Sequence, residues 1–313
     1  MRRAAALLLA ALGAIGAGWP AAGMERQRQQ VVTVGTGAMR GSYYPTARAI
    51  CRVVNRELRG ENIRCSAEPT YGSVYNLQMM QSGDLDFALA QADVQHQAMT
   101  GVGEWAQQPF VTLRAVFPVY EESVALVVTS DSGIANLDGL RGRRLNAGVP
   151  GSGTRATWDA IAAVAAWQGN QRVRLVETGD AAGALCGGRV DAAVTVGFHP
   201  VSSVRGQLAA CATRIVPVEG ALRDSVVAQH PYFRAAVIPA AAYGLAAPVP
   251  TIGMRTDFVT SAATDPRIVA AFLRAVLANR DELASVLPAL VGWNPEASRD
   301  TIAPLHEAVR ARR

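Results

Sequence analysis

Three short stretches of the sequence combine glycine with hydroxyl side chains directly before a predicted helix. They are residues 31–46 (VVTVGTGAMRGSYYPT), 70–73 (TYGS) and 150–154 (PGSGT). The first turn of a helix has backbone N–H groups without intrahelical partners, and the helix dipole makes this end positive. A serine, threonine or tyrosine hydroxyl beside it adds a donor. Each stretch is therefore typical of a site that holds an anionic group such as a carboxylate.

The segments around these stretches predict a repeated order of strand, glycine turn and helix. A β-branched run at 31–34 precedes the first turn, and predicted strands at 63–69 and 144–149 precede the other two. Apolar residues at helical spacing follow the turns. Open α/β sheets bind ligands where strands end and helices begin, so we expect the three turns to meet at one site.

A buried strand predicted at 84–90 brings two further polar residues to the same type of position. Gln91 at the end of this strand is a site candidate, whereas Asp93 is placed to cap the following helix. Ser73 is likewise placed to cap its own helix, and Asn76 lies one turn further along.

Two enzymatic interpretations of the glycine turns have weaker support. Residues 35–41 have the spacing G-x-G-x-x-x-G, one residue longer than the dinucleotide fingerprint, although Glu68 could imitate the acid that binds the ribose. Ser152 could be a nucleophile, but Pro150 stands where the motif G-x-S-x-G requires glycine. A hydroxyl that caps a helix and contacts a ligand is the interpretation favoured for Ser152.

The two halves of the chain share a pattern that predicts two α/β lobes. Residues 83–89 (GDLDFAL) are matched by 188–194 (GRVDAAV), each a helix end followed by a buried strand with an aspartate. Apolar segments within 111–129 and 250–255 are typical of crossings between lobes. The predicted division is lobe one, 24–120 with 248–313, and lobe two, 121–247.

The second copy of this pattern ends in a glycine, an aromatic residue, a histidine and a proline, at 197–200. This end is equivalent to the segment around Gln91 in the first copy. His199 could donate a hydrogen bond to an anion or could pack beside Phe198, and both interpretations stay open.

Residues 1–23 have the three parts of an export signal. Two arginines at positions 2 and 3 precede an apolar run at 4–17, which is too short to span a bilayer, and small residues at 21–23 form a cleavage site. We therefore expect general secretion, cleavage of this segment and a periplasmic protein.

The composition is that of a folded globular protein, with 50% hydrophobic and 18% charged residues. All 30 basic residues are arginine, and they are scattered along the chain. Because no basic stripe or aromatic platform is present in the sequence, we predict no nucleic-acid partner.

Four cysteines, at positions 51, 65, 186 and 211, indicate disulfides in an exported protein. Pairing Cys51 with Cys65 and Cys186 with Cys211 gives each predicted lobe one bridge. A metal site is the weaker alternative, because the sequence has no C-x-x-C and no clustered histidines. We predict neither a metal nor a cofactor.

Most of the chain after residue 23 resembles the TAXI family of solute receptors from TRAP transporters. The matching stretches are VTVGTGAMRGSYYP, TYGSVYNLQMMQSGDLDFALAQADV, LRGRRLNAGVPGSGTRAT, GRVDAAVTVGFHP and VIPAAAYGLAAPVPT. The resemblance implies a type II periplasmic-binding-protein fold, in which two α/β lobes joined by hinge crossovers close on a solute. It implies a receptor without catalytic activity that delivers a glutamate-like amino acid or small carboxylate to TRAP membrane permease subunits.

The predicted ligand-binding residues are Gly37, Ser42, Tyr43, Ser73, Asn76, Gln91, Gly151, Ser152, Thr154, Phe198 and His199. Arg40 and Arg155 are the nearest candidates for a side chain that pairs with a ligand carboxylate. Two other functions compete with transport. One is an exported ligand-sensing subunit that uses the same lobes without a permease, and the other is an exported oxidoreductase or hydrolase.

Overall fold

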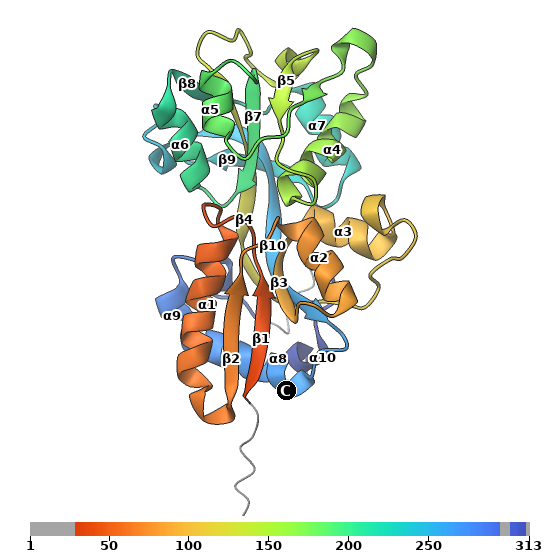
Figure 1. Ribbon diagram of the computed structural model, residues 1–313, viewed down its shortest axis with the longest axis vertical. Helices are drawn as coiled ribbons and strands as arrows, with labels where there is room; N and C mark the ends of the chain where they lie inside the picture. Colours follow the sequence, from red (N-terminus) through yellow and green to blue (C-terminus); the bar gives the residue numbers. More distant parts are fainter. Residues whose placement is uncertain (1–28, 295–300, 311–313) are drawn as a thin grey trace, which may run out of the picture.

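The computed structural model describes residues 29–294 and 301–310, and the predicted export signal at 1–23 lies outside them. The described chain forms two α/β lobes, one above the other in Figure 1, that are connected by two long strands. These shared strands are β4 (Leu113–Thr129) and β10 (Val249–Ser261).

The lower lobe in Figure 1, lobe one, contains both the N-terminal and the C-terminal described segments. Its elements are β1 (Gln30–Gly35), α1 (Tyr43–Glu57), β2 (Ile63–Glu68), α2 (Ser73–Ser82), β3 (Phe87–Gln91), α3 (Ala92–Thr100), α8 (Pro266–Ala278), α9 (Arg280–Leu283) and α10 (Glu307–Arg310).

Lobe two, the upper lobe, is built from the middle of the chain. Its elements are β5 (Arg144–Asn146), α4 (Gly153–Ala165), β6 (Arg174–Leu175), α5 (Ala181–Cys186), β7 (Ala192–Gly197), α6 (Ser202–Ala210), β8 (Thr213–Val216), α7 (Ala221–Gln229) and β9 (Arg234–Ile238).

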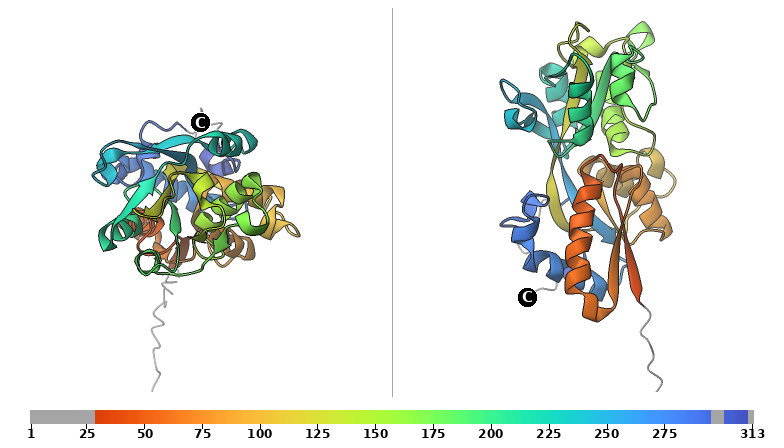
Figure 2. Two further views of the ribbon diagram at one scale, coloured as in Figure 1. Left: turned by 90° about the horizontal axis from the view of Figure 1, so that it is seen from above. Right: turned by 60° about the vertical axis from the view of Figure 1, so that its left-hand side comes forward.

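One sheet runs through both lobes in the order β2-β1-β3-β10-β4-β7-β5-β6, with β8 paired to β4 and β9 paired to β10. The strands β1, β2 and β3 are parallel, as are β5, β6 and β7, whereas β4 and β10 are antiparallel to their neighbours. Figure 2 shows the two lobes with β4 and β10 passing between them. The two crossings between lobes that the sequence predicts are therefore the paired strands β4 and β10.

The sequence predicts two apolar segments between 111 and 129, and the structure has one continuous strand there. The pairing of β4 with β10 shifts register at Pro118, where Tyr120 pairs with Thr256 but Pro118 pairs with Asp257. Proline has no N–H for the ladder and is tolerated at such bulges. The proline therefore bends this crossing strand without ending it. The predicted lobe boundaries at 120/121 and 247/248 fall within β4 and just before β10, and this exact division stays a prediction.

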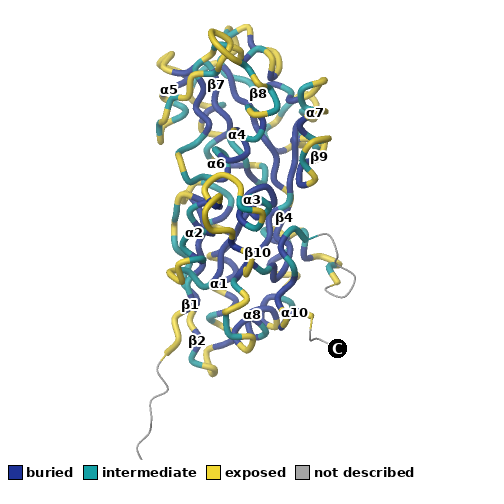
Figure 3. The backbone as a smooth tube through the Cα atoms, turned by 90° about the vertical axis from the view of Figure 1, so that its right-hand side faces the viewer, coloured by how far each residue is buried: buried dark blue, intermediate teal, exposed yellow. Residues whose placement is uncertain are grey.

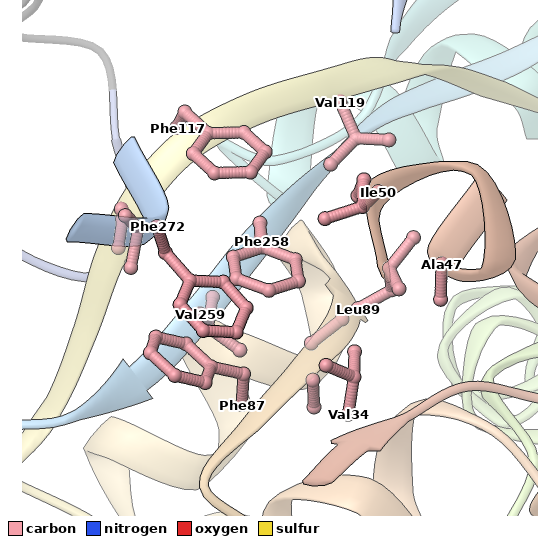
Figure 4. Close-up of a cluster of buried hydrophobic side chains, with 14 of the residues drawn as sticks. Val34, Ala47, Ile50, Phe87, Leu89, Phe117, Val119, Phe258, Val259 and Phe272 are labelled. Carbon is pink, nitrogen blue, oxygen red and sulfur yellow. The ribbon is translucent and has the colours of Figure 1, made fainter. Parts of the chain in front are cut away.

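The core of lobe one is organised around stacked phenylalanines (Figure 4). Phe117 on β4 stacks on Phe258 of β10 with ring centroids 4.7 Å apart, and Phe87 stacks on Phe272 of α8 at 4.8 Å. Burial of each ring contributes about 1.5–3 kcal/mol. Helix α8, in the C-terminal part of the chain, packs on α1, and Asp265 caps α8 by accepting a hydrogen bond from the Arg267 N–H.

Lobe two has its own core, in which Trp158 and Ile161 of α4 pack with Leu145 and Val226. Buried backbone continues between the two cores along β4 and β10 (Figure 3). The predicted disulfides are confirmed, because Cys51 is bonded to Cys65 in lobe one and Cys186 to Cys211 in lobe two. Among residues 29–294 and 301–310, no helix has the length and apolar character needed to cross a membrane.

Candidate functional site

A cleft of about 540 Å³ lies between the lobes and is lined by residues of both. The N-terminal ends of α1 and α2 enter it from lobe one, and those of α4, α5 and α6 enter it from lobe two. These helices are in the part of the chain that the structure describes, and their N–H groups and dipoles favour a negatively charged group in the space between them.

The structure brings most of the predicted site residues to this cleft. The predicted residues that line it are Gly37, Ser42, Tyr43, Ser73, Gln91, Ser152 and Thr154. The predicted residues outside its lining are Asn76, Gly151, Phe198 and His199. The four outside the lining have other contacts, which explain their positions.

Ser42 and Phe198 connect the lobes at one side of the cleft. The Phe198 N–H donates a hydrogen bond of 3.1 Å to Ser42 Oγ, and the Ser42 hydroxyl lies 3.4 Å from the Phe198 carbonyl oxygen. The Phe198 ring stacks on Tyr120 with centroids 4.8 Å apart. Phe198 therefore contributes backbone contacts between the lobes, and its ring packs on lobe one instead of facing the cleft.

A second contact between the lobes involves Gly151, whose carbonyl oxygen accepts a 3.1 Å hydrogen bond from the Tyr75 N–H. Nearby, Gly153 at the start of α4 lies directly against Gln91. A Cβ atom at this glycine would overlap Gln91 Oε1 and lie 3.0 Å from Ser73 Oγ. The two lobes are therefore in contact beside the cleft, and a residue without a side chain is required at position 153.

The hydroxyl groups of the third turn are used within lobe two. Ser152 caps α4 as expected, since its Oγ accepts from the Arg155 N–H at 3.2 Å and donates to the Val149 carbonyl at 2.7 Å. Thr154 Oγ1 accepts from the Val196 N–H at 3.2 Å. These side chains hold the helix end in place, so backbone N–H groups are the donors that α4 offers to a ligand.

The cap predicted for Ser73 is wrong, because Gly72 occupies the cap position of α2 and no side chain caps it. Ser73 Oγ instead accepts from the Gln91 N–H at 3.2 Å and lies 3.2 Å from the Tyr43 hydroxyl. The Tyr43 O–H donates to Glu122 Oε2 at 3.0 Å. A buried polar network thus extends from two helix starts to the shared strand β4.

Glu122 is the acidic member of this network and lines the cleft with 3% of its surface exposed. Its Oε2 also accepts a 2.6 Å hydrogen bond from Thr256 on β10. Burial raises the pKa of Glu122 to about 7, and the nearby charge of Asp93 acts in the same direction, whereas the two hydroxyl donors lower it.

The predicted cap at Asp93 is also wrong, because Gln91 has the cap position of α3 and makes no side-chain cap. Asp93 lies inside the helix, fully buried, and its Oδ2 accepts a 2.6 Å hydrogen bond from Thr157 of α4. Burial raises the pKa of Asp93 to about 6. The Asp93 side chain therefore contacts the other lobe and does not cap its own helix.

Asn76 supports the first glycine turn without contributing to the lining of the cleft. Its Nδ2 donates to the carbonyl oxygens of Thr36 at 2.7 Å and Leu89 at 3.0 Å, and its Oδ1 accepts from the Thr70 hydroxyl at 2.7 Å. These hydrogen bonds connect α2 to the turn after β1, to β3 and to the segment before Gly72, so the structure gives Asn76 a positioning role beside the cleft.

His199 packs within lobe two, beside a cis peptide bond to Pro200. Its Nδ1 lies 2.6 Å from the Tyr243 hydroxyl and its Nε2 lies 3.1 Å from the Ser123 carbonyl oxygen. A neutral ring that carries its proton on Nε2 satisfies both contacts. Burial lowers the pKa of His199 to about 4, which agrees with a neutral imidazole. The structure thus favours the packing interpretation over contact with an anion.

The two candidate arginines differ in position. Arg40 lines the cleft and is exposed. Arg155 is outside the lining and pairs with Asp159 at 3.1 Å and with Glu177 at 3.6 Å. Only Arg40 is therefore placed to approach a ligand carboxylate.

Several lining residues were not expected from the sequence. They are Glu122, Asn146, Asp180, Ser202, Ser203 and Gln207. Ser202 begins α6 after a proline and a valine, without the glycine that marks the other turns. A search for any hydroxyl residue at a predicted helix start would have found it. Gln207 is almost fully buried, and its Oε1 has no hydrogen-bond partner within the described chain.

No group of three or more histidine, cysteine, aspartate or glutamate side chains within 29–294 and 301–310 is arranged to hold a metal ion. The donors of the cleft are backbone amides, hydroxyls, side-chain amides and the Arg40 guanidinium. This donor set suits an organic anion or zwitterion.

Comparison with known proteins agrees with this architecture. Residues 34–311 match the NMT1-like family. The chain belongs to this NMT1-like family.

Solved structures with this fold have low sequence identity to the NMT1-like chain. MatC from Rhodopseudomonas palustris with bound malate is 17% identical, with a TM-score of 0.54 over 83% of this chain and 88% of MatC. A Xanthomonas citri protein solved with bound ATP is 15% identical, with a TM-score of 0.51 over 90% and 94%.

A putative L-cystine ABC transporter protein from Listeria monocytogenes is 14% identical, with a TM-score of 0.50 over 83% of this chain and 97% of its own. At such identities the similarity establishes the fold. The predicted type II periplasmic-binding-protein fold is confirmed.

Proposed function

We propose that this protein is the exported solute receptor of a TRAP-type transporter of the TAXI subtype. In this proposal it binds a small carboxylate or a glutamate-like amino acid between its lobes, in the periplasm, and delivers it to membrane permease subunits. The observation that carries the proposal is the meeting of helix N-termini from both lobes, α1 and α2 of lobe one with α4, α5 and α6 of lobe two, around one cleft.

The energetics of such a cleft favour a ligand that both lobes contact. Backbone N–H groups and helix dipoles stabilise a carboxylate without a full opposing charge. Contacts from both lobes are complete only when the lobes are together, so ligand binding favours the closed arrangement. Two structural neighbours, MatC with bound malate and a putative L-cystine ABC transporter protein, are consistent with small ligands of this kind.

The geometry gives no support to the hydrolase interpretation. Ser152 Oγ is held between the Arg155 N–H and the Val149 carbonyl oxygen, so it accepts from and donates to backbone. A serine nucleophile needs a general base within hydrogen-bond reach. Its hydroxyl proton is directed at a carbonyl oxygen instead.

Calorimetric titration of the mature protein tests the proposal. L-Glutamate, L-glutamine, L-aspartate, L-malate, 2-oxoglutarate and citrate are the ligands to titrate, and we expect at least one to bind with a one-to-one stoichiometry. Gly206 lines the cleft on α6 and has no atom within 4 Å of an added Cβ, so Gly206→Trp should fill the cleft and reduce affinity at least tenfold.

Ala209→Trp, on the exposed side of the same helix, is the matched control and should bind as the wild type does. Equal loss in both variants, or full affinity in Gly206→Trp, would place the ligand elsewhere. Copurification of the ligand-loaded receptor with its cognate permease would separate transport from sensing. N-terminal sequencing of the periplasmic protein should show a start after Gly23.

A further inference from the structure

One oxygen of the buried Glu122 carboxyl group has no hydrogen-bond partner among residues 29–294 and 301–310. The residue lies on β4 where the strand passes between the lobes, and its Oε2 takes the hydrogen bonds from Tyr43 at 3.0 Å and Thr256 at 2.6 Å. Oε1 accepts none from the residues that the structure describes. Oε1 is not one of the enclosed polar atoms of the described chain, and Glu122 lines the cleft, so this oxygen is open to the cleft and a ligand that brings a donor can bind it in place of water.

The charges of the cleft lining also favour a ligand that carries a hydrogen-bond donor. Its ionisable side chains besides the tyrosines are Arg40, Glu122 and Asp180, so acidic groups are not outnumbered by basic ones. Asp180 is occupied in part, because its Oδ1 accepts from the Gly183 N–H at 2.9 Å. A ligand with only negative groups would meet Glu122 without compensation.

Donors for a carboxylate lie close to this acceptor. The Tyr43 hydroxyl that binds Glu122 is 3.2 Å from Ser73 Oγ, in the first turn of α2, and Gly153 at the start of α4 would place a Cβ 3.0 Å from the same oxygen. A negatively charged acceptor and two positive helix ends therefore border one small volume. This arrangement complements a molecule that carries an ammonium group next to a carboxylate.

We propose that Glu122 is a specificity-determining residue that selects an amino acid over the oxo or hydroxy acid of the same carbon skeleton. Its Oε1 accepts a hydrogen bond from the ligand ammonium group, while the helix ends bind the ligand carboxylate. This inference rests on the proposed receptor function and names its substrate class.

The protonation of Glu122 provides an independent signature. Burial raises its pKa to about 7, so the carboxyl group of the empty site is partly protonated at neutral pH. The titratable groups around it are Tyr43 and Tyr120, whose pKa values burial raises, and Asp93; Arg40 and Asp180 line the same cleft. An ammonium group at Oε1 favours the ionised form and releases a proton, whereas a carboxylate at Oε1 requires proton uptake.

Calorimetry at pH 7 in two buffers of different ionisation enthalpy measures both affinity and proton exchange. The probes are matched pairs, L-glutamate with 2-oxoglutarate and L-aspartate with L-malate. We expect the amino acid of the better-binding pair to bind at least tenfold more tightly than its partner and to release up to one proton.

Variants connect this preference to Glu122. Glu122→Gln should reduce the preference at least tenfold and abolish the proton release, with its folding checked by thermal unfolding. Asp93→Asn removes another buried acid with a raised pKa but leaves the cleft lining intact. It should retain the preference and the direction of proton release, with a smaller amount released because the charge of Asp93 contributes to the raised pKa of Glu122.

Two sets of results would overturn the inference, and they are distinguishable. Tighter or equal binding of the oxo or hydroxy acid, proton uptake, or an unchanged preference in Glu122→Gln would refute the role of Glu122 and leave the receptor proposal standing. If no member of either pair binds, nor any ligand of the wider series, the receptor proposal fails and this inference fails with it.

Discussion

Thr157 of lobe two donates a 2.6 Å hydrogen bond to Oδ2 of Asp93 in lobe one, and both side chains are fully buried. This contact joins α3 to α4. The other donors to the Asp93 carboxylate within the described chain are backbone N–H groups of α3, including that of Val94. The ionised carboxylate of Asp93 is therefore stabilised by a residue of the other lobe.

We expect Thr157→Val to destabilise the protein by about 1–3 kcal/mol at pH 8, because it leaves a buried carboxylate without its side-chain donor. The pKa of Asp93 is raised by burial to about 6 and lowered by this hydrogen bond, so the variant raises it further. Its folded pKa lies above the unfolded value, so Asp93 contributes less stability as pH rises through this range. Denaturant unfolding at pH 5 and pH 8 should show a larger loss at pH 8. Thr157→Ser, which keeps the hydroxyl, is the control.

Gly153→Ala should weaken ligand binding. The added Cβ overlaps Gln91 Oε1, so either Gln91 moves or the lobes separate. Overpacking of this kind costs about 1–3 kcal/mol, which corresponds to a loss of roughly 5- to 150-fold in affinity. Calorimetry measures the affinity and small-angle scattering measures the separation of the lobes. Gly60→Ala, where an added Cβ meets no atom within 4 Å, should behave as the wild type. A Gly153→Ala protein with wild-type affinity would contradict the closed contact.

His199 should make stability dependent on pH in the acidic range. Burial lowers its pKa from 6.5 to about 4, so the unfolded chain binds more protons between these values and stability falls as pH decreases through them. The contribution is at most about 3 kcal/mol. His199→Gln should have a shallower decline between pH 6.5 and pH 4, measured by chemical unfolding. An identical slope in both proteins would show that His199 is not responsible.

The disulfide of lobe two should contribute about 3 kcal/mol, because it closes a loop with a sequence separation of 25 between Cys186 and Cys211. Replacing both cysteines by alanine should lower the free energy of unfolding by this amount. Urea unfolding followed by the fluorescence of Trp158 in lobe two measures the change. A loss below 1 kcal/mol would indicate that the bridge adds little to a lobe that its core already holds.

The sequence predicts the local parts of the site better than their partners. The glycine turns, the cap at Ser152 and the strand that ends at Gln91 follow from patterns within a few residues of each other. Ser73 and Asp93 have the side chains of helix caps, yet their hydrogen bonds go to residues far away in the sequence or in the other lobe. Local propensity does not determine which distant residue such a side chain will bind by a hydrogen bond.

Glu122 shows why the rest of the site could not be predicted. In the sequence it is the second of two adjacent glutamates within an apolar region and is typical of an exposed crossing. Its neighbour Glu121 is exposed, whereas Glu122 faces inward because side chains alternate along β4. Which of the two is buried depends on the register with β10, where Glu122 is opposite Met254.

The position of β10 in the sheet has a consequence for how the chain is made. Strands β3 and β4 are not paired with each other, and β10 lies between them. During synthesis β3 and β4 emerge long before Val249–Ser261, so the sheet remains in two separate parts until the last fifth of the polypeptide leaves the ribosome. A chain that completes its central sheet so late cannot fold fully for most of its translation. An incompletely folded chain is what a secretion channel for unfolded polypeptides can accept.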